Sequence, residues 1–300
     1  MLHSKYSAYF FLLIAVLSWA GNVVFGRYLH DILPPFGLSF WRWGIAVAIL
    51  MLINVRHTLA FFKLLKRHFY QFFLLSFFGL VITSSFQYVA LGYTSATDVG
   101  IMLSLMPIFI ALFAELILKE KTSGLQKTGM LIGFIGALAL ISQGSLHNIR
   151  HLNFNFGDLI AVISSASWGV YTALVKKFKI PCSTWEMIQA VGLIGLILIT
   201  LVLFAGGPHV VGMTFSSDLL KPDIISALIY MGIVASLISY WGWNRGVKIV
   251  GASQSGVFLY LTPIFSALFA TVFLHEQLHL FHLFGGLIIF VGMYLTLKKA

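Results

Sequence analysis

The segment His275-Glu276-Gln277-Leu278-His279 has the residue types and the spacing of a zinc site. Two histidines four residues apart share one face of a helix and can bind zinc, while the glutamate beside the first serves as a general base in hydrolases. The sequence offers no obvious acidic third ligand, and Glu276 also belongs to an internal repeat described below. A membrane metalloprotease is therefore a remote alternative, and we predict no catalytic residue, no bound metal and no cofactor.

Arg42 is a basic residue inside an apolar stretch that is long enough to cross a membrane. It lies eight residues into the expected helix 35–54, about 11 Å deep at the α-helical rise per residue. A guanidinium at that depth must find an anion, a carbonyl oxygen or water, which makes it a functional candidate. It either binds a substrate carboxylate or phosphate through two hydrogen bonds, or it anchors neighbouring helices. The side chain can still reach outward from this depth, which slightly favours the structural role.

Two tryptophans, Trp19 and Trp168, are expected near the middle of the membrane, whereas tryptophan usually gathers at the membrane surfaces. Asn22 lies one helical turn from Trp19 on the same face. Such side chains are typical of a cavity wall, and packing between helices is the competing explanation. We predict that a substrate cavity is lined by Trp19, Asn22, Arg42, Gln87, Ser104, Trp168, Tyr171, Trp241, Asn244 and Tyr260.

The composition of the chain is that of a polytopic membrane protein. Of its 300 residues, 59% are hydrophobic and 9% are charged, whereas about 25% of the residues in a soluble domain are charged. The net charge of +10 comes from short basic clusters between apolar stretches, where topology signals lie, so we expect no nucleic-acid partner. The single cysteine, Cys182, excludes an internal disulfide and a cysteine-based metal site.

Ten apolar stretches approach the roughly 20 residues that a membrane-spanning helix needs. They are 8–29, 35–54, 69–91, 95–118, 125–143, 157–178, 184–206, 223–244, 252–274 and 280–297. With the N-terminus inside, 15 Lys and Arg residues fall in the cytoplasmic segments and three fall outside. Because cytoplasmic loops carry the excess of basic residues, both termini are predicted to be cytoplasmic.

Residues 96–120 occur a second time at 252–276, with 13 of 25 positions identical at a constant offset of 156. The chain is therefore divided into two repeats, 1–148 and 149–300, each with five expected helices. An odd number of spans forces the two repeats into opposite orientations in the membrane. Inverted repeats of this kind are typical of secondary transporters, because one packing arrangement can then face either side.

Each copy of the repeated stretch contains a proline within its helix, Pro107 in the first and Pro263 in the second. Proline removes a helical hydrogen bond, so both helices are predicted to bend beside the cavity, as a hinge or as a static kink. A glutamate ends each copy, Glu120 and Glu276, and we expect these two residues to hold turns or contacts at a gate.

The chain resembles the drug/metabolite transporter superfamily, specifically chains with two EamA domains. The resemblance covers nearly the whole length and rests on Ser18-Trp19-Ala20-Gly21-Asn22 with Arg27 at the helix end, Arg42 after Pro34-Pro35, Tyr93-Thr94-Ser95-Ala96, the Leu-x-Pro motifs at Pro107 and Pro263, and the closing Glu120 and Glu276. It implies ten helices in two inverted five-helix repeats, with a central substrate cavity that opens alternately to each side.

These observations together predict a multi-pass transporter of the inner membrane that moves a small organic metabolite through the lipid bilayer. By resemblance, export of an amino acid or a related compound is the expected activity. Uptake or exchange, including of a nucleoside-containing metabolite, is the alternative. The sequence is compatible with a monomer and with a homodimer.

Overall fold

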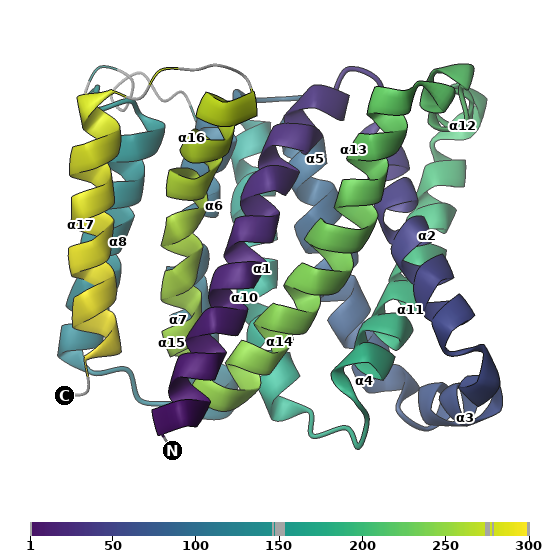
Figure 1. The fold of residues 1–300 in the computed structure, drawn as a ribbon, viewed down its shortest axis with the longest axis horizontal. Helices are drawn as coiled ribbons and strands as arrows, with labels where there is room; N and C mark the ends of the chain where they lie inside the picture. The colour runs from purple at the N-terminus through teal and green to yellow at the C-terminus, as the bar shows by residue number, and fades with distance from the viewer. Residues whose placement is uncertain (1, 146, 148–153, 274–276, 278, 299–300) are drawn as a thin grey trace.

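The computed structural model describes residues 2–145, 147, 154–273, 277 and 279–298, and all regular secondary structure in these ranges is helical. Ten of its helices are long and apolar enough to cross a membrane, which confirms the predicted all-α, ten-span architecture. The spans are Lys5–Leu29, Pro35–Ile53, Phe69–Ala90, Thr97–Leu118, Gly124–Ile141, Phe156–Lys177, Thr184–Ala205, Pro222–Val250, Ala252–Phe269 and Leu280–Leu297. Both chain ends lie at the same end of the bundle (Figure 1).

Several spans consist of more than one helical segment. The first five are built from α1 (Leu2–Leu29), α2 (Pro35–Ile53), α4 (Phe69–Ser76) with the π-helical segment η2 (Phe77–Ser85) and α5 (Phe86–Ala90), α6 (Ala96–Leu103) with α7 (Met106–Leu118), and α8 (Gly124–Ile141). The last five are α10 (Phe156–Lys177), α11 (Thr184–Ala205), α13 (Pro222–Gly232) with the π-helical segment η4 (Ile233–Ile238) and α14 (Ser239–Val250), α15 (Ala252–Gly256) with the 3₁₀ segment η5 (Val257–Leu261) and α16 (Thr262–Phe273), and α17 (Leu280–Leu297).

Short helices lie between the spans at the two ends of the bundle. They are η1 (Val55–His57), α3 (Thr58–Arg67), α12 (Gly207–Thr214) and η3 (Ser217–Leu220). Figure 1 shows α3 lying across the end of the bundle that carries the termini.

The spans α8, α10 and α11 begin with reciprocal side-chain caps. In α8 the Ser123 hydroxyl accepts a hydrogen bond from the Gln126 amide while the Gln126 side chain accepts one from the Ser123 amide. The pairs Asn155/Asp158 and Ser183/Glu186 cap α10 and α11 in the same way. These caps satisfy amide groups that the helix itself leaves without partners, and the two acidic caps also suit the positive end of the helix dipole.

Large apolar side chains are exposed along the spanning helices rather than clustered in one patch. Examples are Leu131 on α8, Leu201 on α11 and Phe290 on α17, all more than half exposed. A soluble protein rarely exposes so many large apolar side chains, whereas the hydrocarbon core of a bilayer can surround them.

Helices α8 and α17 lie side by side at one edge of the bundle and contact each other through glycines (Figure 1). A Cβ atom added at Gly129 would lie 2.7 Å from the carbonyl oxygen of Gly292, and one added at Gly292 would lie 2.6 Å from that of Gly129. Gly136 and Gly285 approach in the same way, at 2.9 and 3.1 Å. Since Gly129 meets the later glycine of α17 and Gly136 meets the earlier one, the two helices are antiparallel.

The two π-helical segments start 156 residues apart, at Phe77 and at Ile233, which is the offset of the sequence repeat. In each of them a side-chain hydroxyl binds the carbonyl five residues back: Thr83 binds Phe78 at 2.7 Å and Ser236 binds Met231 at 2.9 Å. A π-helical turn is wider than an α-helical turn and leaves backbone carbonyls for other partners. Both segments lie at the middle of their spans.

Each proline of the repeated stretch lies at the start of a new helical segment. Pro107 is in the first turn of α7, which follows a break after α6, and Pro263 is the second residue of α16, which follows η5. Proline has no backbone N–H, but the N–H groups in the first turn of a helix have no partner within the helix, so no hydrogen bond is lost there. The change in backbone hydrogen bonding occurs just before each proline, at the break after α6 and in η5. At both prolines, where the sequence predicts a bend within one helix, the span is divided into two helical segments.

Candidate functional site

A cavity of about 1310 Å³ lies between the helices. It reaches the exposed residues Arg27, at the end of α1, and Gln143, after α8. Since α1 begins and α17 ends at the opposite end of the bundle, the cavity opens away from both termini. Nine predicted residues are among those that line it: Trp19, Asn22, Arg42, Gln87, Ser104, Trp168 and Tyr260, together with Pro107 and Pro263.

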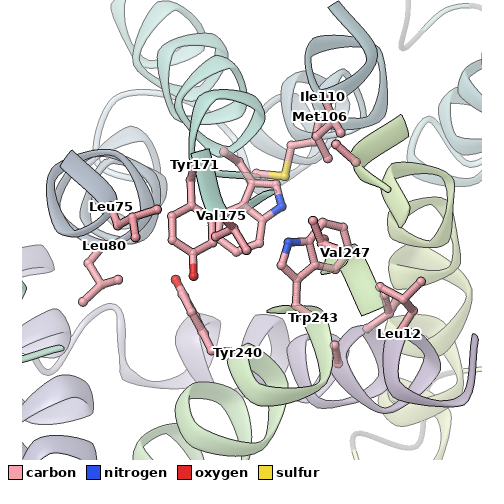
Figure 2. Close-up of a cluster of buried hydrophobic side chains, with 14 of the residues drawn as sticks. Leu12, Leu75, Leu80, Met106, Ile110, Tyr171, Val175, Tyr240, Trp243 and Val247 are labelled. Carbon is pink, nitrogen blue, oxygen red and sulfur yellow. The ribbon is translucent and has the colours of Figure 1, made fainter. Parts of the chain in front are cut away.

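Aromatic rings form the inner end of the cavity. Trp19 on α1 and Trp168 on α10 meet edge to face, with ring centroids 5.1 Å apart, and Tyr240 on α14 lies 5.9 and 5.6 Å from them. Trp243 packs behind both tryptophans at 5.4 and 5.5 Å. Figure 2 shows Tyr171, Tyr240 and Trp243 pointing toward one another between the helices. We call Trp19, Trp168, Tyr240 and Trp243 the aromatic layer; the first three of these side chains line the cavity at its inner end.

Arg42 lines the cavity and is almost fully buried, with 4% of its surface exposed. Its Nε donates to Ser236 Oγ at 2.8 Å, its Nη2 donates to the Ala235 carbonyl at 2.6 Å, and its Nη1 donates to the Tyr88 hydroxyl at 3.3 Å. All three acceptors are neutral. No carboxylate pairs with Arg42 among the described residues, so its charge is balanced only by dipoles.

The carbonyl of Ala235 is a shared acceptor in the π-helical segment η4. Besides Arg42 it receives hydrogen bonds from Trp19 Nε1 at 3.2 Å and from Ser239 Oγ at 2.6 Å. The equivalent carbonyl of the first repeat, that of Gly79 in η2, receives one from the Tyr240 hydroxyl at 2.8 Å. The widened turns thus supply backbone acceptors that position cavity side chains from three different spans.

The hydrogen bonds of Arg42 also orient Asn22. A guanidinium can only donate, so the Tyr88 oxygen accepts from Arg42 and its own proton goes to Asn22 Oδ1, 3.2 Å away. The amide oxygen of Asn22 is thereby used, and its Nδ2 has no hydrogen bond among the described residues. Because Asn22 lines the cavity, it presents a donor there.

Three other predicted residues lie outside the cavity lining. Tyr171 and Asn244 are behind the aromatic layer, where the Tyr171 hydroxyl donates to Asn244 Oδ1 at 3.0 Å. Trp241 faces away from the cavity and stacks on Trp185 at 5.9 Å, with the Arg245 guanidinium 5.1 Å from its ring. Trp241 and Asn244 come after η4, whose wider turn changes the angular position of every later residue on the span, whereas Tyr171 lies on the uninterrupted α10.

Thr83, Ser84 and Ser266 line the cavity although the sequence did not single them out. Thr83 and Ser84 belong to η2, and the spacing of apolar residues does not distinguish a π-helical turn from an α-helical one. Ser266 could have been chosen as a polar residue within an apolar span, one turn after Pro263.

The basic residues and histidines of the described lining are Arg27, Arg42, His279 and His282, and this described lining contains no aspartate or glutamate. The described ranges contain no cluster of three His, Cys, Asp or Glu side chains able to hold a metal. His275 and Glu276 of the zinc-like motif lie outside the described residues.

Near the terminal end, burial raises the pKa of the Cys182 thiol to about 11, so it stays protonated at neutral pH.

At the terminal end of the bundle an ion pair joins two spans from different repeats. Lys176 Nζ on α10 lies 2.7 Å from Glu120 Oε1, just beyond α7, and the two side chains are 36% and 26% exposed. Gly251 packs against them with a φ of 94°, a conformation that favours glycine. The expectation that Glu120 makes a contact at this end is consistent with this pair.

A model of the EamA-like transporter family matches this chain twice, over residues 6–142 and 155–298. An uncharacterized transporter of Archaeoglobus fulgidus is 29% identical over 290 residues, which cover 96% of each chain. The uncharacterized transporter YyaM of Bacillus subtilis is 26% identical over 89% of this chain and 86% of its own. A WAT1-related protein of Arabidopsis thaliana is 24% identical over 92% of this chain and 82% of its own. One solved crystal structure, 21% identical, shares the fold with a TM-score of 0.77 and covers 98% of this chain and 97% of that one.

Proposed function

Because the chain belongs to the EamA-like transporter family, within the drug/metabolite transporter superfamily, we propose that it exports an amino acid or a related small metabolite by alternating access. The family and the names of its relatives indicate a transporter and not an enzyme. We place the protein in the inner membrane, with both termini in the cytoplasm.

The observation that carries this proposal is the cavity that is open at one end and closed at the other. A carrier that works by alternating access must hold its substrate near the middle of the membrane and seal one side at a time. The aromatic layer and the Lys176–Glu120 pair provide the seal at the terminal end. With cytoplasmic termini, the structure represents the state that is open to the outside.

The contacts between the repeats support the exchange of the two halves that this mechanism needs. An offset of 156 converts the contact of Gly129 with Gly292 into that of Gly285 with Gly136, and both contacts occur. Two antiparallel helices related in this way are expected from inverted repeats. The π-helical segments at the same offset add to this support.

The basic residues at the two ends differ in a way that fits one open and one closed side. Lys176, in the second repeat, is paired with Glu120 at the closed end. Its counterpart in the first repeat, Arg27, is exposed at the cavity mouth and has no ion pair among the described residues. We infer that the Lys176–Glu120 pair breaks when the cavity opens to the cytoplasm.

Reconstitution into proteoliposomes tests the transport proposal. The purified chain is assayed for exchange of labelled amino acids and nucleosides, and then for net movement in each direction in vesicles of known orientation. Export of an amino acid is expected. Net inward movement, or movement of a nucleoside alone, would support the uptake or exchange alternative, and no flux of any compound above protein-free vesicles would contradict the proposal.

Charge reversal tests the closing pair. In Lys176→Glu the new carboxylate faces Glu120, so closure at the terminal end is weakened and exchange should slow by about tenfold, the effect of roughly 1.4 kcal/mol. The double variant Lys176→Glu/Glu120→Lys restores the attraction and should recover most of the rate. Reversal of the Lys127–Glu115 pair, 3.0 Å apart on α8 and α7, is the matched control and should leave exchange unchanged. Equal rates in all variants would remove this pair from the mechanism.

A further inference from the structure

The geometry points to a substrate that is held as an organic carboxylate, with the carboxylate on Arg42 and Asn22 and the apolar part of the molecule against Trp19 and Trp168. This inference rests on the proposed transport function and specifies the chemistry that the cavity recognises. The ammonium group of an amino acid is not required for it.

The first argument is the charge of the cavity. The described lining contains Arg27 and Arg42 but no aspartate or glutamate, and the three hydrogen-bond acceptors of Arg42 are all neutral. A buried guanidinium without a carboxylate nearby creates a positive potential that the low-dielectric surroundings do little to screen. An anion entering from the open end lowers this electrostatic energy, whereas an organic cation raises it and finds no described carboxylate in the lining.

The second argument is the set of hydrogen-bond donors. A guanidinium has five N–H groups, and the three contacts of Arg42 with Ser236, Ala235 and Tyr88 use three of them. One N–H thus stays on each terminal nitrogen, which suits the two oxygens of a carboxylate. Asn22 adds its Nδ2 donor, because Tyr88 occupies its oxygen. Arg42, Tyr88 and Asn22 are thus linked by hydrogen bonds that leave N–H donors of Arg42 and Asn22 available to the cavity.

The third argument is the apolar surface beside these donors. Trp19 and Trp168 line the same cavity at its inner end, and Tyr240 adjoins them. Asn22 and Trp19 lie on the same face of α1, one turn apart, so a ligand anchored at the donors reaches the rings. A flat or branched apolar group can be buried there at roughly 25 cal/mol per Å² of apolar surface.

A matched set of three probes tests the inference by equilibrium binding to the purified full-length chain. The probes are 3-phenylpropanoate, 3-phenylpropanamide and 3-phenylpropylamine, which share one skeleton and carry charges of −1, 0 and +1 at neutral pH. The anion is expected to bind at least about tenfold more tightly than the amide, and the amine most weakly. An equal or reversed order, or no binding by any of the three, would overturn the inference.

Variants locate the effect at the two proposed donors. Arg42→Gln removes charge-assisted hydrogen bonds and should weaken binding of the anion by about 10- to 100-fold without weakening that of the amide equally. Lys221→Gln removes one exposed charge outside the cavity, paired with Asp218, and should change binding less than about twofold. An equal loss in both variants would mean that overall charge, and not this site, selects the anion.

Asn22→Asp keeps the inference testable if Arg42→Gln does not fold. The substitution preserves the shape of the side chain, turns its donor into a carboxylate and neutralises Arg42, so the preference should move from the anion toward the amine. Retained preference for the anion would contradict the proposed site. Binding and flux separate the two proposals: selective binding without flux contradicts transport alone, and flux of amino acids with no preference for the anionic probe contradicts this inference alone.

Discussion

The two repeats contribute equivalent residues to the contact between α8 and α17, whereas they contribute different residues to the cavity. At the edge of the bundle, Gly129 and Gly136 meet Gly292 and Gly285 with nearly equal distances in both pairs. In the centre, equivalent carbonyls of the π-helical segments have different donors: Gly79 receives a neutral tyrosine hydroxyl, and Ala235 receives a charged guanidinium.

The difference extends to the paired tryptophans. Trp19 Nε1 donates to Ala235, but Trp168 Nε1 is buried without a hydrogen-bond partner in the described structure. The position that matches Arg42 at the offset of 149 is Val191, an apolar residue. The comparison teaches that the two repeats share a backbone arrangement, whereas the buried arginine of the cavity comes from the first repeat.

The strongest way to break this asymmetry is to give the second repeat its own arginine. Val191 is 2% exposed on α11, and Ser76 Oγ donates to its carbonyl at 2.8 Å. In Val191→Arg a charged guanidinium replaces a buried apolar side chain, so we expect a loss of about 3–5 kcal/mol of stability and little folded protein in size-exclusion chromatography.

Val191→Leu is the control for volume and should fold. Full stability of Val191→Arg alone would show that the second repeat accepts a charge as readily as the first.

Paired glycine substitutions test the symmetric part of the comparison. Gly136→Ala and Gly292→Ala, which the offset of 156 relates, each place a methyl group against backbone atoms of the other helix and should each cost about 1–3 kcal/mol, by a similar amount in both. Gly44→Ala, where a Cβ would meet no atom within 4 Å, is the control and should not lower the melting temperature. Clearly unequal costs would show that the contact is not equivalent on its two sides.

Arg42→Met and Tyr240→Phe test the difference between the donors to the Ala235 and Gly79 carbonyls. They have the smallest expected effects on stability. After Arg42→Met, the Ala235 carbonyl keeps Trp19 and Ser239 as donors, so the melting temperature should stay near that of the wild type while probe binding is lost. Tyr240→Phe leaves the Gly79 carbonyl without its donor and should cost about 1 kcal/mol. A large loss of stability in Arg42→Met would make Arg42 a structural anchor, as its depth in the sequence suggested.

The spans were predictable because bilayer thickness imposes a length and an apolar composition that few other structures need. Trp19, Asn22 and Arg42 were predictable for the same reason, since polar or amphipathic groups at mid-membrane depth are costly unless a cavity or a partner receives them. The depth of a residue follows from counting along a helix, and these three lie on uninterrupted α-helices.

Of the three predicted residues outside the cavity lining, Tyr171 lies on the uninterrupted α10, and the other two lie on a span that is not α-helical throughout. Trp241 and Asn244 follow η4, where an additional residue in one turn rotates the rest of the span by about 100° relative to a regular helix. Thr83 and Ser84 lie within η2 itself. The interhelical hydrogen bonds that stabilise these segments come from residues far apart in the sequence, so local patterns carry little information about them.

The reciprocal glycine contact of α8 and α17 has a consequence for how such a chain can arise. It has the form of an isologous interface, in which residue i of one partner meets residue j of the other and j meets i. A chain with only one repeat would offer the same surface to a second copy of itself in the opposite orientation. Within one polypeptide this surface is an intramolecular contact, and the two repeats can carry different residues elsewhere, as they do at Arg42 and Val191.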